Sequence, residues 1–146
     1  MRKLFFVSLV SGILLSHVLW AADVDCDVCG MIIKDKVSNH FILKKATVTE
    51  KALNACSIPC VTKAKKSSAH YTKVEVSDFN HPGKFLDGDK AFFLIKSKNL
   101  KKDLGDMVMP PHVVACATKE EAAAAQKKYG DGKVVQGFDN VLKEVL

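Results

Sequence analysis

Four of the five cysteines fall in two closely spaced pairs, and this spacing suits metal or thiol chemistry. The first pair is Cys26-Asp-Val-Cys29, and the glycine that follows it allows a tight turn that directs both sulfur atoms to one centre. This motif alone is compatible with a metal site, a redox dithiol or a plain disulfide. The second pair, Cys56-Ser-Ile-Pro-Cys60, has its cysteines about one helical turn apart. Together the pairs offer four thiolates, which is enough to close a tetrahedral zinc site.

Three methionines add soft ligands to this inventory. Met31 lies two residues after Cys29, and Met107 and Met109 lie in a loop that ends in two prolines. Thiolates combined with thioethers favour Cu(I), whereas ordinary packing of the loop on the core is the alternative for the two loop methionines. His112 is either a further ligand or a solvated loop residue.

Cys60 and Cys116 are expected to lie in different environments. Cys60 is expected in the first turn of a helix, where the positive end of the helix dipole favours its thiolate. Cys116 lies within the apolar run VVACA and is expected to be a core residue. A thiol–disulfide oxidoreductase based on Cys26 and Cys29 is disfavoured, because the strand–CxxC–helix context of such a site is missing.

The composition argues against several classes of function. The chain has 146 residues and a net charge of +6, but its excess of positive charge is lysine, with Arg2 as the single arginine. Sequence-specific binding of nucleic acid usually depends on arginine, so no nucleic-acid partner is expected. There is no nucleophile elbow, no phosphate-binding glycine loop and no pair of catalytic carboxylates. We therefore expect neither an enzyme nor a small-molecule substrate.

The first 22 residues have the layout of an export signal. Arg2 and Lys3 precede an uncharged stretch of 17 residues from Leu4 to Trp20, and two alanines complete the segment. An uncleaved membrane anchor is the alternative, because this length approaches that of a transmembrane helix. Cleavage is expected at residues 21–22, which would leave a periplasmic chain of residues 23–146 with a net charge of +4.

The apolar pattern predicts an α+β fold for residues 23–146, with small mixed strands, two or three helices packed on one side, and two ββαβ-like halves. A helix is expected to begin at Ser57 and to continue through Lys66. Thr118-x-x-Glu121 is a capping box that begins a second helix, which ends at Gly130. A last helix is expected over 140–146, a long loop over 99–111, and a strand or turn over 51–56. The remaining strands are expected at 41–48, 73–79, 85–86, 91–95, 113–117 and 133–138.

Four segments of the chain resemble the NosL family, the periplasmic copper-binding accessory proteins of nitrous oxide reductase. The double cysteine motif is also similar to small heavy-metal-sensing domains of the TRASH type. The segments are CDVCGM at 26–31, CSIPC at 56–60, the stretch from Val76 to Phe92 that ends in Lys-Ala-Phe, and the stretch from Met109 to Phe138 that contains VACATKEEA.

The resemblance implies that Cys29, Met31 and Met109 bind Cu(I) and pass it to the copper centre of the reductase. Nitrous oxide reductase or another copper protein is the implied partner, together with a copper transporter. The chain departs from the family in three respects. It lacks a lipoprotein cysteine signal, its loop reads Met107-Val-Met109-Pro-Pro, and Cys116 replaces a phenylalanine. The alternative from the residues alone is a structural or sensory zinc domain that uses Cys26, Cys29, Cys56 and Cys60.

Overall fold

A computed structural model of the chain describes residues 24–33, 40–46, 51–67, 70–104 and 108–146. The predicted export signal and Met107 lie outside these residues. The strands are β1 (Val24–Asp25), β2 (Ile32–Ile33), β3 (Phe41–Lys45), β4 (Leu53–Ala55), β5 (Tyr71–Ser77), β6 (Phe85–Asp87), β7 (Phe92–Ile95), β8 (Val114–Cys116) and β9 (Lys133–Gln136). The helices are α1 (Ile58–Ser67), α2 (Leu100–Leu104), α3 (Lys119–Tyr129) and α4 (Phe138–Val145). Within these described ranges, no helix is both long enough and apolar enough to span a bilayer.

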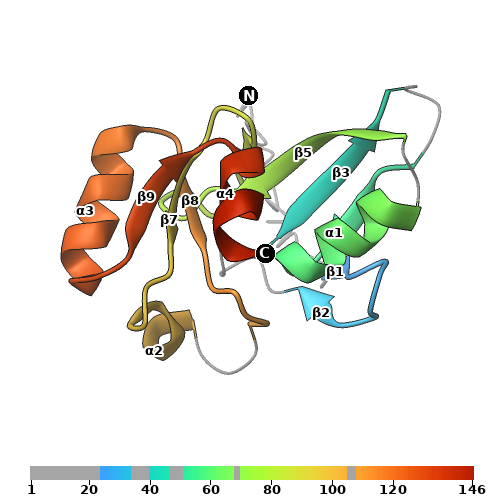
Figure 1. Ribbon diagram of the computed structural model, residues 1–146. Helices are drawn as coiled ribbons and strands as arrows, with labels where there is room; N and C mark the ends of the chain where they lie inside the picture. Colours follow the sequence, from blue (N-terminus) through green and yellow to red (C-terminus); the bar gives the residue numbers. More distant parts are fainter. Residues whose placement is uncertain (1–23, 34–39, 47–50, 68–69, 105–107) are drawn as a thin grey trace, which may run out of the picture.

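The first half is an antiparallel sheet with strand order β4-β3-β5-β6, and α1 connects β4 to β5 (Figure 1). The side chains of β3 alternate, so that Phe41 and Leu43 are fully buried while Lys44 is exposed. Val74 and Val76 of β5 pair with these two residues and are buried as well. The period of two therefore defines the face of the sheet that packs into the core.

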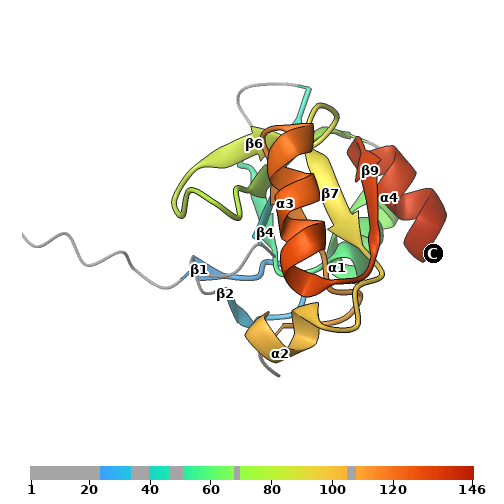
Figure 2. The same cartoon turned by 90° about the vertical axis from the view of Figure 1, so that its left-hand side faces the viewer.

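The second half repeats this plan with the order β8-β7-β9, and α3 connects β8 to β9. Figure 2 shows α3 in front of this sheet. The predicted capping box is confirmed, since Thr118 accepts a hydrogen bond from Glu121 N and the Glu121 side chain accepts one from Thr118 N. Gly130 ends the helix in the left-handed conformation, which glycine adopts without steric cost.

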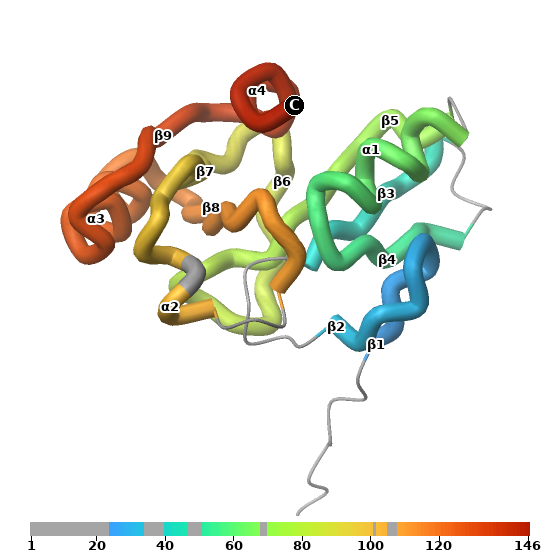
Figure 3. Tube along the Cα trace, turned by 60° about the horizontal axis from the view of Figure 1, so that its bottom comes forward, coloured from blue at the N-terminus to red at the C-terminus, as the bar shows by residue number. Residues whose placement is uncertain are grey.

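Helix α4 lies where the two halves meet (Figure 3). The ring centroid of Phe138 is 5.6 Å from that of Phe41 in the first sheet and 6.2 Å from that of Phe93 in the second. All three rings are buried, and they belong to one core cluster that also contains Cys26, Cys56 and Cys60. The cysteines are thus fixed to the main core of the molecule.

The α+β class and the two ββαβ halves are confirmed, since in each half the first strand lies between the second strand and the strand that follows the helix. Several elements differ from expectation. Strands β1 and β2 were not predicted, and β5 begins and ends two residues earlier than expected. The predicted loop 99–111 contains the short helix α2, in which Leu100 is fully buried. Helix α4 begins at Phe138 instead of Asn140, because Gly137 leaves the strand with a φ of 81° and donates a hydrogen bond to Ala91 O.

Candidate metal centre

The first cysteine pair lies in the loop between the paired strands β1 and β2. The loop closes on itself through two backbone hydrogen bonds of 2.8 Å, from Cys26 N to Met31 O and from Gly30 N to Cys26 O. Gly30 has a φ of 74°, which a residue with a β-carbon rarely adopts. The expected role of this glycine is therefore confirmed, and the closed loop holds Cys26 and Cys29 on one short turn.

The second pair flanks the start of α1. Cys56 follows β4 directly, and Cys60 lies in the first helical turn. Ser57 caps this turn as predicted, with its Oγ accepting a long hydrogen bond of 3.4 Å from Cys60 N. Val61 N donates to Ser57 O at 3.0 Å, which continues the helical pattern. The turn places both sulfur atoms at the N-terminal end of the helix.

Asp27 and Asn54 join the two pairs. Asp27 N donates to Asn54 O at 2.9 Å, and Asp27 Oδ2 accepts from Asn54 N at 2.7 Å and from Asn54 Nδ2 at 3.3 Å. Asn54 Oδ1 in turn lies 2.9 Å from His40 Nε2. These contacts fix the first cysteine loop against the strand that leads into the second pair. Sequence reasoning missed both residues, and the position of Asp27 between the cysteines was the only available signal.

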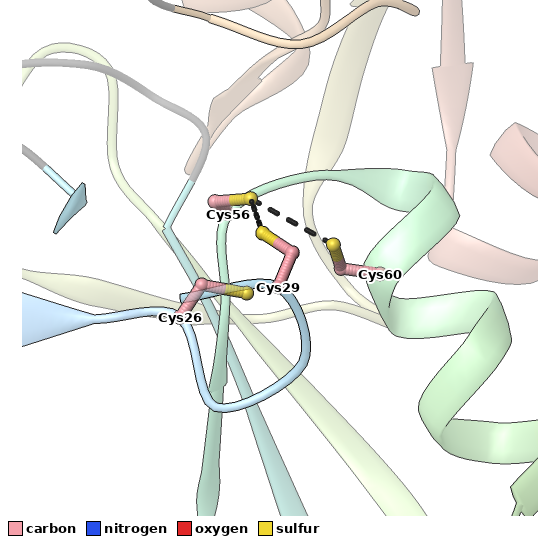
Figure 4. Close-up of side chains that lie close together, drawn as sticks. All are labelled: Cys26, Cys29, Cys56 and Cys60. Carbon is pink, nitrogen blue, oxygen red and sulfur yellow. Dashed lines mark hydrogen bonds between the residues drawn. The ribbon is translucent and has the colours of Figure 1, made fainter. Parts of the chain in front are cut away.

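The four sulfur atoms form one cluster, as the paired spacing predicted (Figure 4). All of them lie within 4.8 Å of one another. Cys29 Sγ is 3.5 Å from Cys56 Sγ, and Cys56 Sγ is 3.7 Å from Cys60 Sγ. Four thiolates around one ion at the usual zinc–sulfur distance would be about 3.8 Å apart. The cluster therefore has the donor type and the dimensions of a thiolate metal site.

Exposure differs within the cluster. Cys26, Cys56 and Cys60 are buried, whereas Cys29 is exposed to solvent. A metal ion bound here would be shielded on three sides and reachable from the side of Cys29.

The buried thiols also differ in acidity. Burial alone would raise the pKa of Cys26, but three backbone N–H groups donate hydrogen bonds to its sulfur and lower the pKa to about 7. The donors are Val28, Cys29 and Cys56. Burial and hydrogen bonding with Cys29 raise the pKa of Cys56. A bound metal must therefore displace protons from part of the cluster.

The expected thiolate at Cys60 is wrong for the metal-free site. Burial raises the pKa of this thiol, and hydrogen bonding with Cys29 raises it further, although the side chain of Ser57 opposes the shift. Loss of hydration outweighs the favourable helix terminus because Cys60 is only 5% exposed.

The two described candidate methionines, Met31 and Met109, differ in their surroundings. Met31 is 38% exposed at the end of the first cysteine loop. Met109 is partly buried and packs against the core cluster that contains Cys26, Cys56 and Cys60. Met107 lies outside the described residues. The structure thus brings the four cysteines together and places Met109 on the same core.

Cys116 and His112 are separate from the cluster. Cys116 is fully buried in β8, and burial raises the pKa of its thiol to about 12, so that it remains protonated. The predicted core role of Cys116 is therefore confirmed. His112 is partly buried beside Pro111 and lines a shallow pocket with Lys96 and Glu144.

The fold and the cluster together define a small α+β domain with a four-thiol candidate metal centre. No family model matches the chain, and no curated protein matches it. Among solved structures, the copper chaperone NosL from Shewanella denitrificans is similar to it, with a TM-score of 0.60 and 24% sequence identity over 80% of this chain and 87% of that one. At this identity the likeness shows a shared fold, and the predicted resemblance to NosL is confirmed at that level.

Proposed function

We propose that this chain is an exported copper(I) chaperone that delivers copper for the maturation of nitrous oxide reductase, and that it catalyses no reaction itself. The observation that carries the proposal is the cluster of four cysteine sulfur atoms within 4.8 Å of one another, on a fold shared with a copper chaperone. Cu(I) is the soft ion that thiolates and thioethers prefer. The ion is the cargo of this protein and not its resident cofactor.

Transfer of the ion follows from the unequal exposure of the ligands. Cys29 is the exposed cysteine of the cluster, so the incoming ligand of a partner protein meets the ion on that side. The buried thiols of Cys56 and Cys60 have raised pKa values, and their protons return when the ion leaves. Proton return then favours release, because a protonated thiol is not a ligand.

Two alternative sets of residues could hold the ion, and experiment can distinguish them. In the first, which the NosL resemblance implies, Cys29, Met31 and Met109 hold the ion. In the second, the four cysteines hold it. A set rich in neutral thioethers releases Cu(I) more easily than one with four thiolates, because the thioethers neutralise none of the ion's charge. The first set therefore suits a chaperone, and the second a site that retains its ion.

A zinc-binding domain is the second candidate, and the sulfur–sulfur distances favour it. Two of the separations, Cys29–Cys56 at 3.5 Å and Cys56–Cys60 at 3.7 Å, are close to those of a tetrahedral tetrathiolate zinc site. Such a site would stabilise the fold by joining the β1–β2 loop to the start of α1.

Metal competition separates the two candidates. The protein is purified without oxygen, offered Cu(I) and Zn(II) together in equal amounts, and analysed for bound metal after desalting. The copper proposal expects copper to be retained and zinc to be excluded. Retention of one zinc ion per chain with copper left in solution would support the zinc domain. The variant Cys116→Ala is the control, because Cys116 lies outside the cluster and should leave the result unchanged.

A further inference from the structure

Lysine side chains are concentrated on three consecutive elements of the first half. β3, α1 and β5 contain the lysines Lys44, Lys45, Lys63, Lys65, Lys66 and Lys73, and Glu75 is their one acidic residue. These 22 residues carry a net charge of +5, whereas the whole chain carries +6. The remaining residues sum to a net charge of +1, so these three elements carry most of the net positive charge of the chain.

Most of these lysines gather at one end of this half, which we call the basic end. Lys45 at the end of β3 is the register partner of Tyr71 at the start of β5. Three residues connect Ser67, the last residue of α1, to Tyr71, so the last helical turn with Lys65 and Lys66 must lie at the same end. Figure 1 shows this end of α1, β3 and β5 on the right-hand side.

Ion pairs neutralise lysines of the sheet, whereas the lysines of α1 have no such pairs with described residues. Lys44 pairs with Glu75 at 2.7 Å, and Lys73 pairs with Asp87 at 3.3 Å. The three lysines of α1 form no ion pair with any other described residue. Lys65 Nζ lies over the Phe138 ring at 5.9 Å from its centroid, so its charge is directed toward α4 and away from the basic end. Lys63 and Lys66 are exposed.

We propose that the basic end binds the surface of an anionic phospholipid bilayer. A protein-binding surface normally has an apolar, aromatic or arginine-rich centre and is depleted in lysine. The large apolar side chains exposed among the described residues are Met31, Ile32 and Leu146, and none belongs to the basic end. Clustered lysines without an apolar centre are instead typical of attraction to anionic headgroups.

Such binding would orient the candidate metal centre. Helix α1 has 10 residues and is roughly 15 Å long, with Cys60 in its first turn and Lys65 and Lys66 in its last. The cysteine cluster would therefore face away from the bilayer and remain open to a partner. This consequence rests on the proposed copper function, whereas the lipid binding itself does not.

Vesicle flotation of the full chain tests the proposal. The vesicles contain phosphatidylcholine alone, or equal parts of phosphatidylcholine and phosphatidylglycerol, at low and at high salt. The N-terminal apolar segment is identical in every variant, and its contribution is measured on the neutral vesicles. The test variant is Lys63→Gln and Lys66→Gln combined. The control combines Lys119→Gln and Lys127→Gln, which removes the same charge from exposed positions in α3.

We expect salt-sensitive binding that requires phosphatidylglycerol and falls by at least about tenfold in the test variant, since each lysine near an anionic surface contributes roughly fivefold. The control should bind like the wild type. Equal losses in both variants, or no loss in the test variant, would overturn the proposal. Binding of the chain to immobilised polyglutamate without binding to the vesicles would also overturn the proposal, because it would indicate an acidic protein partner. Cu(I) titration of the same variants in solution keeps the two proposals separate, because the lysine changes should leave metal affinity unchanged.

Discussion

Replacement of Asp27 by alanine should weaken metal binding without removing any candidate ligand. The Asp27 carboxylate accepts hydrogen bonds from Asn54 N at 2.7 Å and from Asn54 Nδ2 at 3.3 Å, and these bonds fix the first cysteine loop beside the second pair. The backbone bond from Asp27 N to Asn54 O survives the change, so the loop keeps one connection to β4.

The size of the effect follows from these contacts. The Asp27 side chain is 26% exposed, so water replaces part of what is lost, and removal of its charge-assisted hydrogen bonds should cost about 1–2 kcal/mol. Its ion pair with Lys51, at 3.8 Å and highly exposed, adds little. If this energy holds the two cysteine pairs together, Cu(I) affinity should fall by about tenfold.

Anaerobic titration with a competing Cu(I) chelator measures that fall. Asp25→Ala is the matched control, because it removes the same charge from an exposed position two residues earlier. The reasoning is refuted if Asp27→Ala binds Cu(I) like the wild type, or if the control loses as much affinity. Urea unfolding of both variants shows whether the expected loss of stability accompanies the loss of affinity.

Three further predictions concern other parts of the molecule. Met109→Leu should weaken Cu(I) binding in the same titration and leave the thermal midpoint unchanged, because leucine has nearly the same volume as methionine. If Met109→Leu instead binds Cu(I) with wild-type affinity and Cys56→Ala loses binding, the four-cysteine set is favoured. Thr118→Ala should lower the free energy of unfolding by about 1 kcal/mol through loss of the α3 cap and leave metal affinity unchanged, and stability equal to the wild type in urea would contradict it. Hydrogen bonds from Lys133 and Lys96 lower the pKa of Glu144 from 4.5 to about 2, so its contribution to stability is present above pH 4.5 and is lost as the pH falls toward 2. Glu144→Gln should flatten this part of the stability–pH curve, and an unchanged curve would show that the ion pairs contribute nothing.

The elements that were predictable have local signals. Thr118, Glu121 and Gly130 mark both ends of α3, and Ser57 with Pro59 marks the start of α1. The short helix α2 was missed because its five residues, rich in lysine, depend on burial of Leu100 in the tertiary structure. The start of α4 depends on the contact of Gly137 with Ala91, far away in the sequence.

In the candidate site, too, some features were predictable from the sequence and others were not. The spacing of the cysteines predicted that they meet, and they do. The contacts that bring them together were not predictable, because Asp27 and Asn54 are 27 residues apart and neither is itself a ligand of a cysteine motif. The acidity of Cys60 was misjudged for a related reason. The helix terminus is visible in the sequence, but the burial that outweighs it appears only in the packed structure.

Removal of the exposed thiol is the most direct test of copper binding by the cysteine cluster. Cys29→Ala leaves the buried thiols of Cys26, Cys56 and Cys60 in place and removes the sulfur through which a partner would reach the ion. In anaerobic titration against a competing Cu(I) chelator, we expect Cys29→Ala to lose Cu(I) binding while the wild type retains one ion. Retention of Cu(I) by Cys29→Ala with wild-type affinity would contradict it.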